Sequence, residues 1–334
     1  MRAILHIGLP KTGSSSIQAY LKRNEAQLRE ASVFLPRCAY PNVSANLLAD
    51  IAVESRAVTP ARIKRGINRS KKEIAALHQK FLVDLEQELS QRPLQSTVVF
   101  SSEGLISLVT NRWRMKRLEN LVTKHFSDIQ VIAYVRPQHQ WLRSTFTQEL
   151  RRGGVPLDLY EHQYRRRIVL KYSKVDQLWS RSFGRKNVSF RPLVREHLYE
   201  ENLLADFCHS TGIPYNTDLS DTLTNLSLSP EGQIKAMCIN LLCLSGDIVE
   251  QERREIIRYL NTSYPGKGFA PSEKQVLKIQ RYFRPYNTVP GCEHFSTPVE
   301  QGSDTPILSE EIIDCVKRPS FQRETLAEIR ARMG

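Results

Sequence analysis

Short apolar runs, each followed by turn residues and then by a helical pattern, most narrowly constrain how this 334-residue chain can fold. We expect buried strands at Ala3–Ile7, Ser96–Ser101, Gln130–Val135 and Asn187–Arg191. Helices are expected over about Ser14–Glu30, Lys71–Gln91 and Glu200–Thr211, and after Pro137. Strands that alternate with helices form parallel βαβ units. The predicted fold class is therefore α/β, a three-layer sandwich with a central parallel sheet.

The remaining segments give the expected domain organisation. Residues 36–68 are irregular, and the last third, from about Leu223, has mainly helix and loop patterns. We predict one α/β domain over residues 1–290, with a mostly helical insertion over 36–95. A polar C-terminal tail of helix and loop over 291–334 follows.

Charge and composition limit which binding partners and which cellular compartment we expect. A net charge of +13 favours anionic partners, but no nucleic-acid-binding motif accompanies it, so we expect no nucleic acid partner. The run Ala3–Ile7 is too short for a signal-peptide core, and no stretch of eighteen apolar residues occurs. The six cysteines form no CxxC pair, which favours reduced thiols and a cytoplasmic protein, with no zinc site.

The turn after the first strand has the residues of an anion site. HIGLPKTGSSSIQ, residues 6–18, gives a strand, a tight turn and a helix start, an arrangement that points backbone amides at one anion. Lys11 adds a full positive charge, and Gly13 allows close backbone approach. Lys11 precedes Gly13, unlike the GxxxxGK[ST] loop that pairs its hydroxyl with magnesium, so we expect no metal. The alternative is an ordinary helix start capped by serines.

PKTGSSS, residues 10–16, resembles the 5′-phosphosulfate loop of sulfotransferases that use 3′-phosphoadenosine 5′-phosphosulfate (PAPS). The wider HIGLPKTGSSSIQ is similar to the form common in bacterial and carbohydrate sulfotransferases. The resemblance covers core elements over roughly residues 1–290 and implies the P-loop-NTPase-like sulfotransferase fold. It implies that the donor's 5′ end is bound by Lys11, Thr12, Gly13, Ser14, Ser15 and Ser16.

A second element follows the third strand. VRPQHQWLRS places Arg136 at the strand end and Ser144 about two turns into the next helix, where both can converge on one phosphate. The same spacing is the 3′-phosphate element of sulfotransferases, so the resemblance implies that Arg136 and Ser144 hold the 3′-phosphate. Alternatively, Arg136 pairs with a carboxylate and Ser144 bonds within its own helix.

A weaker resemblance lies in residues 264–287. Similar bacterial sequences have a glycine-rich loop and then a helix ending in Asn here, and the family's late loop closes over the adenosine end. This implies that Lys267, Gly268 and Phe269 close over the adenosine, whereas the alternative is a plain surface loop. Tyr172, ahead of a helix with Trp179, also fits the bacterial pattern, or is core.

Sulfuryl transfer is an in-line displacement, so the protein must position the reactants and neutralise the leaving phosphate. Lys11 is the expected source of that charge. Glu103, after the second strand, is the expected general base, by analogy with carbohydrate sulfotransferases that use Glu. Alternatively, Ser101 or Ser102 caps a short helix whose dipole Glu103 complements. His6 and His139 are rival bases.

The segment 151–172 is strongly basic. One reading is an acceptor-side rim suited to an acidic glycan, and the other is a solvated helix face. Its cations are Arg151, Arg152, Arg165, Arg166, Arg167 and Lys171.

The predicted function is therefore sulfuryl transfer from PAPS to an acceptor hydroxyl on a carbohydrate or glycoconjugate, including acidic glycans and glycolipids. An ATP-dependent, kinase-like P-loop enzyme is one alternative. A non-catalytic nucleotide- or glycan-binding protein is the other.

Overall fold

The structure is a computed structural model that describes residues 1–40, 44–45, 48–49, 71–161, 163–216, 227–297 and 306–333. Most of the predicted irregular segment 36–68, and with it part of the predicted insertion 36–95, lies outside these residues. The chain forms two compact units, which we call the sheet unit and the helical unit. The sheet unit comprises 1–136, 171–222 and 288–292, and the helical unit comprises 137–170, 223–287 and 293–334.

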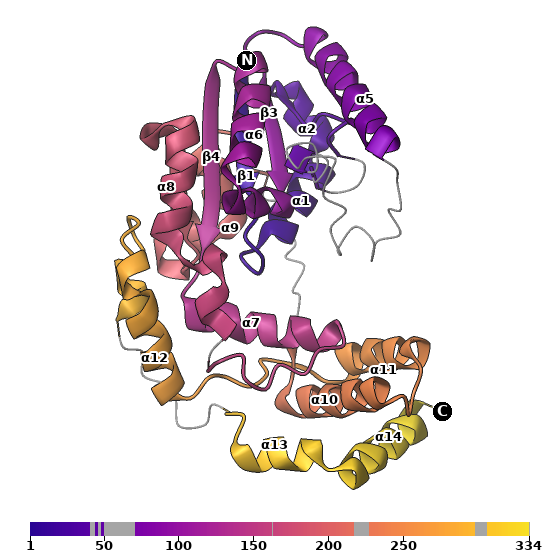
Figure 1. The fold of residues 1–334 in the computed structure, drawn as a ribbon. Helices are drawn as coiled ribbons and strands as arrows, with labels where there is room; N and C mark the ends of the chain where they lie inside the picture. The colour runs from indigo at the N-terminus through magenta and orange to yellow at the C-terminus, as the bar shows by residue number, and fades with distance from the viewer. Residues whose placement is uncertain are drawn as a thin grey trace. The chain divides into compact units, whose positions relative to one another are not determined.

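The sheet unit is built on a five-stranded sheet in which every neighbouring pair is parallel (Figure 1). The spatial order is β2-β3-β1-β4-β5. The strands are β1 (Arg2–Ile7), β2 (Val33–Phe34), β3 (Thr97–Ser102), β4 (Asp128–Val135) and β5 (Val188–Pro192). The central strands are almost continuously buried, as expected for a parallel sheet covered on both faces. The predicted α/β fold with a central parallel sheet is confirmed.

The strand order places three loops of interest together. β1 lies between β3 and β4, with His6 opposite both Ser101 and Ile132. Because parallel strands point the same way, the loops after β1, β3 and β4 leave the same, carboxyl edge of the sheet. Ligands of open α/β sheets bind at this edge.

Helices cover both faces of the sheet. α1 contacts α9, while α6 contacts α8, and right-handed crossovers place these two pairs on opposite faces. The α-helices of this unit are α1 (Ser14–Arg23), α2 (Glu25–Glu30), α5 (Lys71–Ser90), α6 (Arg112–His125), α8 (Tyr172–Phe183) and α9 (Leu203–Thr211). Its 3₁₀ helices include η1 (Glu103–Thr110), η4 (Arg185–Asn187), η5 (Arg195–His197) and η6 (Tyr199–Glu201).

Two predicted helices have different bounds. The helix expected over Ser14–Glu30 is divided at Asn24, whose side-chain amide donates to the Tyr20 carbonyl at 2.9 Å and ends α1. The helix expected from Glu200 begins at Leu203, because Asn202 caps it and Glu200 has a left-handed backbone with φ 52°. The edge strand β2 and the helix α6 were not predicted.

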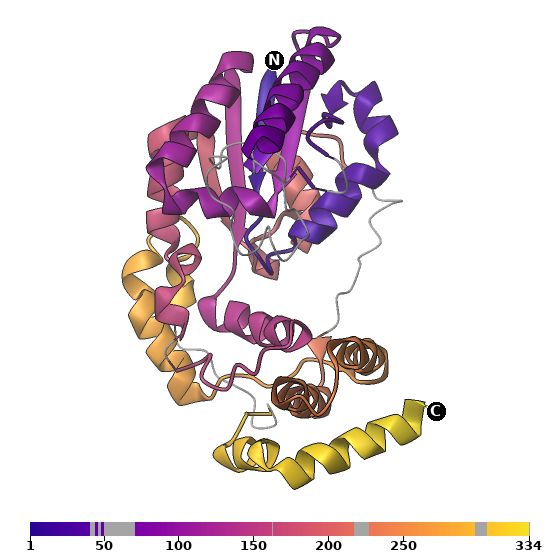
Figure 2. The ribbon, with the colours of Figure 1, turned by 45° about the vertical axis from the view of Figure 1, so that its right-hand side comes forward.

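α10 is the central helix of the helical unit, where it contacts α7, α11 and α14 (Figures 1 and 2). Its helices are α7 (Gln138–Arg151), α10 (Pro230–Ser245), α11 (Glu250–Ser263), α12 (Glu273–Phe283), α13 (Glu310–Lys317) and α14 (Pro319–Met333). A two-residue antiparallel pairing joins β6 (Ser227–Leu228) and β7 (Pro265–Gly266). Within the described residues, no helix has the length and apolar character needed to cross a membrane.

Candidate active site

The loop after β1 has an unusual backbone. Lys11 has φ 65° and Gly13 has φ 81°, so two residues of one turn lie in the left-handed region, and only one of them is glycine. The Thr12 hydroxyl donates to the Leu9 carbonyl at 2.8 Å, and the Ser14 hydroxyl donates to the same oxygen at 3.1 Å. These bonds close the turn before α1 begins.

The N-terminus of α1 has no side-chain cap. Gly13 occupies the cap position, and the Ser14 hydroxyl points to Leu9 instead of to the first-turn amides. The alternative of serine caps therefore does not describe this helix. The first turn of any helix leaves backbone N–H groups without intrahelical acceptors, and an anion can accept from them. Lys11 places a further positive charge in the same turn.

Glu103 lies beside this loop. A Cβ added to Gly8 would come within 2.9 Å of the Glu103 Cγ and 2.8 Å of the Ser14 Oγ, so the three residues pack together. The Ser102 hydroxyl accepts from the Gly104 N–H at 3.0 Å and caps η1. Ser102 thus has the capping role predicted as an alternative, and the exposed Glu103 lies next to the loop after β1.

Arg136 follows β4, the strand that pairs directly with β1. Its carbonyl accepts from the Tyr172 hydroxyl at 2.6 Å, and Tyr172 is fully buried. Burial lowers the pKa of the Arg136 guanidinium below its ordinary value. A partly desolvated cation attracts an anion more strongly than an exposed one because water screens it less. Lys11 and Arg136 thus belong to loops at one edge of the sheet unit.

The other predicted donor residues belong to the helical unit. Ser144 lies on α7, and its neighbour Arg143 donates from Nε to the Lys267 carbonyl at 2.9 Å and from Nη2 to the Gly268 carbonyl at 2.7 Å. Arg143 therefore fixes the loop of residues 266–268, which we call the Lys267 loop, against the helix that carries Ser144. This role of Arg143 was not predicted, since an arginine that binds backbone carbonyls leaves no pattern of residue types.

The loop residues differ in exposure. The Lys267 side chain is exposed, whereas Gly268 is buried and Phe269 is only 2% exposed. The Phe269 N–H donates to the Gln233 side chain at 2.8 Å, and its carbonyl accepts from Tyr160 at 3.3 Å. Phe269 is thus part of the helical unit's core. The pairing of Arg136 with Ser144 on one phosphate stays a prediction.

Neither rival histidine is suited to act as a base. His6 is fully buried, its Nδ1 lies 2.7 Å from the Ser101 hydroxyl, and its ring packs on Phe207 at 5.4 Å. Burial lowers the pKa of His6 to about 3 and that of His139, on α7, to about 4. Both imidazoles are neutral and enclosed at neutral pH.

The basic segment 151–172 is mixed in environment. Arg151 is half-buried and donates to the Asn261 side chain at 2.7 Å, and burial lowers the pKa of its guanidinium. Arg152 is exposed and lies 3.8 Å from Glu149, while Arg165 lies over the ring of Tyr282 at 5.7 Å. The alternative of a solvated helix face is wrong for most of this segment, because α7 ends at Arg151 and the described residues that follow form turns and the short 3₁₀ helices η2 (Gln163–Arg166) and η3 (Ile168–Leu170) before α8.

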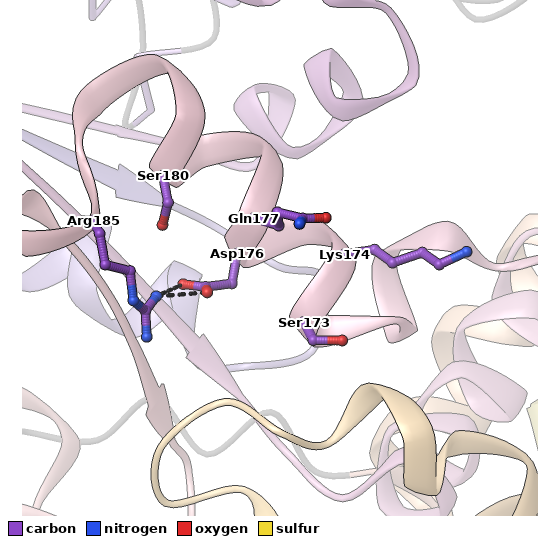
Figure 3. A pocket seen from close by; sticks show the side chains of 6 residues that line it. All are labelled: Ser173, Lys174, Asp176, Gln177, Ser180 and Arg185. Atoms are coloured by element: carbon purple, nitrogen blue, oxygen red, sulfur yellow. Dashed lines mark hydrogen bonds and ion pairs between the residues drawn. The ribbon is translucent and has the colours of Figure 1, made fainter.

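An open cavity of about 340 Å³ lies along α8 and the turn after it (Figure 3). Arg185 donates to both carboxylate oxygens of Asp176, at 2.6 and 2.5 Å, so these two opposite charges pair with each other. None of the predicted site residues lines this cavity; its walls are Ser173, Lys174, Asp176, Gln177, Ser180 and Arg185. Across the described part of the chain, no group of three or more His, Cys, Asp or Glu side chains could hold a metal ion.

Comparison with known proteins gives one similar solved structure. It is that of a sulfotransferase from Alicyclobacillus acidocaldarius, with a TM-score of 0.42 and 12% sequence identity. The similarity covers 87% of this chain and 93% of that chain. No protein-family model matches the chain, and no curated protein matches it.

Proposed function

We propose that this protein is a sulfotransferase that moves a sulfuryl group from PAPS to the hydroxyl of a carbohydrate or glycoconjugate. The observation that carries the proposal is the turn between β1 and α1, with its left-handed Lys11 and Gly13 and its helix end without a side-chain cap. Strained backbone at a sheet's carboxyl edge is typical of functional sites. The resemblance of PKTGSSS to the 5′-phosphosulfate loop supports the choice of donor.

The loop residues fit the donor's 5′ end. The amides at the start of α1 and the Lys11 ammonium supply hydrogen-bond donors and positive charge, as a phosphosulfate requires. Gly8 and Gly13 let the loop after β1, which we call the donor loop, pack closely on its neighbours, since a Cβ at Gly13 would lie 2.1 Å from Leu203 Cδ2. Arg136, on the neighbouring loop, is the proposed partner of the 3′-phosphate.

The chemical step needs charge stabilisation and a base. The acceptor oxygen forms a bond to sulfur while the bond from sulfur to the 5′-phosphate oxygen breaks. Lys11 stabilises the charge that develops on the leaving 3′,5′-bisphosphate (PAP). Glu103 accepts the proton of the acceptor hydroxyl, and its exposure beside Gly8 supports access for both the acceptor and bulk water.

Ser144, Lys267 and Gly268 are proposed as further donor contacts, and cytoplasm as the compartment.

Nucleotide binding tests the donor. We expect calorimetry to show PAP binding without magnesium, and much weaker binding of ADP, which lacks the 3′-phosphate. Arg136→Ala should weaken PAP binding by about 1.5–3 kcal/mol and remove the preference over ADP. Binding of ATP with magnesium but not of PAP would instead support the kinase-like alternative.

Turnover tests the chemistry. Release of PAP from PAPS should require an acceptor oligosaccharide, and Glu103→Gln should lower kcat by about 10²–10⁴-fold while PAP affinity stays unchanged. Glu86→Gln, which removes an exposed carboxylate paired with Lys124, is the matched control and should retain full activity. PAP binding with no turnover on a broad acceptor panel would indicate a non-catalytic binding protein.

A further inference from the structure

Trp113 is the most exposed of the Trp, Tyr and Phe side chains in the described residues. It is 68% exposed, whereas Trp141 is 3% exposed and Trp179 is fully buried. An exposed indole leaves a large apolar surface in contact with water. Exposed aromatic side chains of this kind are common in binding surfaces.

Positive charge surrounds this indole. The segment 111–117, NRWRMKR, has four cations and no acid. The Arg112 guanidinium lies 5.0 Å from the centre of the Trp113 ring, and Lys116 pairs with Glu119 at 2.5 Å. Within the described residues, neither Arg112 nor Arg114 forms an ion pair with a carboxylate. Arg112, Trp113 and Arg114 together form what we call the Trp113 surface.

The Trp113 surface lies at the same edge of the sheet unit as the donor loop. It occupies the first turn of α6, which follows η1, and η1 begins at Glu103 and contacts β1. Eight 3₁₀ residues at about 2 Å each give η1 a length of about 16 Å, a span within the reach of an oligosaccharide.

The end of α6 itself is already satisfied. The Asn111 side chain accepts from the Trp113 N–H at 2.9 Å and from the Arg114 N–H at 3.4 Å. Recognition at this place therefore depends on the side chains and not on free helix amides.

We propose that the Trp113 surface binds an acidic oligosaccharide, the non-reacting part of the acceptor chain. The apolar C–H face of a sugar ring packs on the indole, while the guanidinium groups bind carboxylate or sulfate oxygens in pairs. The inference rests on the proposed function, which supplies a hydroxyl-bearing acceptor at this edge. A single-stranded nucleic acid could also stack on the indole, and the test below distinguishes it.

Tryptophan fluorescence provides the binding assay, since acrylamide should quench Trp113 far more than the two buried indoles. We expect an oligogalacturonate to protect this fluorescence, with affinity that falls as NaCl rises because salt screens exposed charges. Neutral dextran should not protect it. By calorimetry, Trp113→Ala and Arg112→Ser should each weaken oligogalacturonate binding about tenfold, the order expected for a lost stacking or charge-assisted contact.

Arg92→Ser is the matched control. Arg92 also lies over an aromatic ring, that of Phe34 at 4.5 Å, but in the turn before β3, at the opposite edge of the sheet. This variant should bind oligogalacturonate as the wild type does. Circular dichroism and the thermal midpoint should be unchanged in all three variants if they fold normally.

Binding needs no donor, so the inference and the proposed function can fail separately. Loss of binding in Trp113→Ala without any sulfuryl transfer would support the surface and contradict the function. Equal binding by the wild type and both surface variants, or tighter binding of a single-stranded oligonucleotide than of oligogalacturonate, would overturn the inference.

Discussion

Gly13→Ala perturbs the donor loop in a way whose energetic cost can be worked out from its surroundings. With φ 81° and ψ 9°, residue 13 has a left-handed backbone, which costs an L-residue about 1–2 kcal/mol. The new Cβ would also lie 2.1 Å from Leu203 Cδ2, far inside the ordinary contact distance of about 3.5–4 Å. Leu203 must therefore move, at the cost of about 1–3 kcal/mol typical of overpacking.

Gly212→Ala separates these two costs. Gly212 ends α9 in the same unit with φ 67° and ψ 21°, and a Cβ there would meet only Arg2 Nη1, at 3.7 Å. Gly212→Ala should therefore lose stability only through the cost of a left-handed backbone at alanine. The entropy that alanine removes from the unfolded chain is common to both variants and cancels in the difference.

Urea unfolding of the two variants gives the comparison. We expect Gly13→Ala to lower the free energy of unfolding by about 1–3 kcal/mol more than Gly212→Ala does. In a Leu203→Ala background this excess should disappear, which a double-mutant cycle measures. Calorimetry should show weaker PAP binding by Gly13→Ala, because the cap of α1 shifts.

Two results would refute this reasoning. The first is an equal cost for Gly13→Ala and Gly212→Ala, which would mean that Leu203 does not pack on the loop. The second is an excess that persists without the Leu203 side chain.

Three further predictions follow from the same geometry. Lys11→Ala should lower kcat by about 10²-fold or more through lost leaving-group stabilisation, measured as PAP release, while Lys22→Ala on the outside of α1 should not. Arg143→Lys cannot reproduce the two-pronged contact with the carbonyls of the Lys267 loop, so amide hydrogens near residue 268 should exchange faster by mass spectrometry; unchanged exchange would contradict that role. His6 stays neutral when folded but binds a proton below about pH 6.5 when unfolded. The free energy of unfolding should therefore fall as pH drops from 6.5 toward 3, by up to about 1.4 kcal/mol per pH unit, and His6→Asn should flatten this slope in urea titrations.

The elements that sequence patterns predicted well are those whose burial is continuous. Strands β1, β3, β4 and β5 are within two residues of their expected bounds at each end, since an apolar run between turn residues has few other solutions. The two-residue β2 is too short to produce such a run. α6 was missed although its buried residues Met115, Leu118 and Val122 recur at helical spacing.

The candidate site was predicted from residue type and order. The loop 10–16 and Arg136 were proposed in this way, and the pairing of β1 with β4 brings their loops to one edge of the sheet, while their binding roles stay predictions. Contacts between side chain and backbone were not predictable. Leu203 on Gly13 and Arg143 on the Lys267 loop join segments more than a hundred residues apart, and neither pairing changes the local pattern of residues.

The left-handed backbone of Lys11 implies a conflict between stability and catalysis. Glycine adopts φ 65° without the steric penalty that lysine incurs there. Lys11→Gly should therefore raise the free energy of unfolding by roughly 1 kcal/mol, and the greater entropy of glycine in the unfolded chain should partly offset this gain. The same change deletes the ammonium group. The chain thus keeps a costlier residue at a position where the proposed function needs its charge, and the more stable variant should be the poorer enzyme.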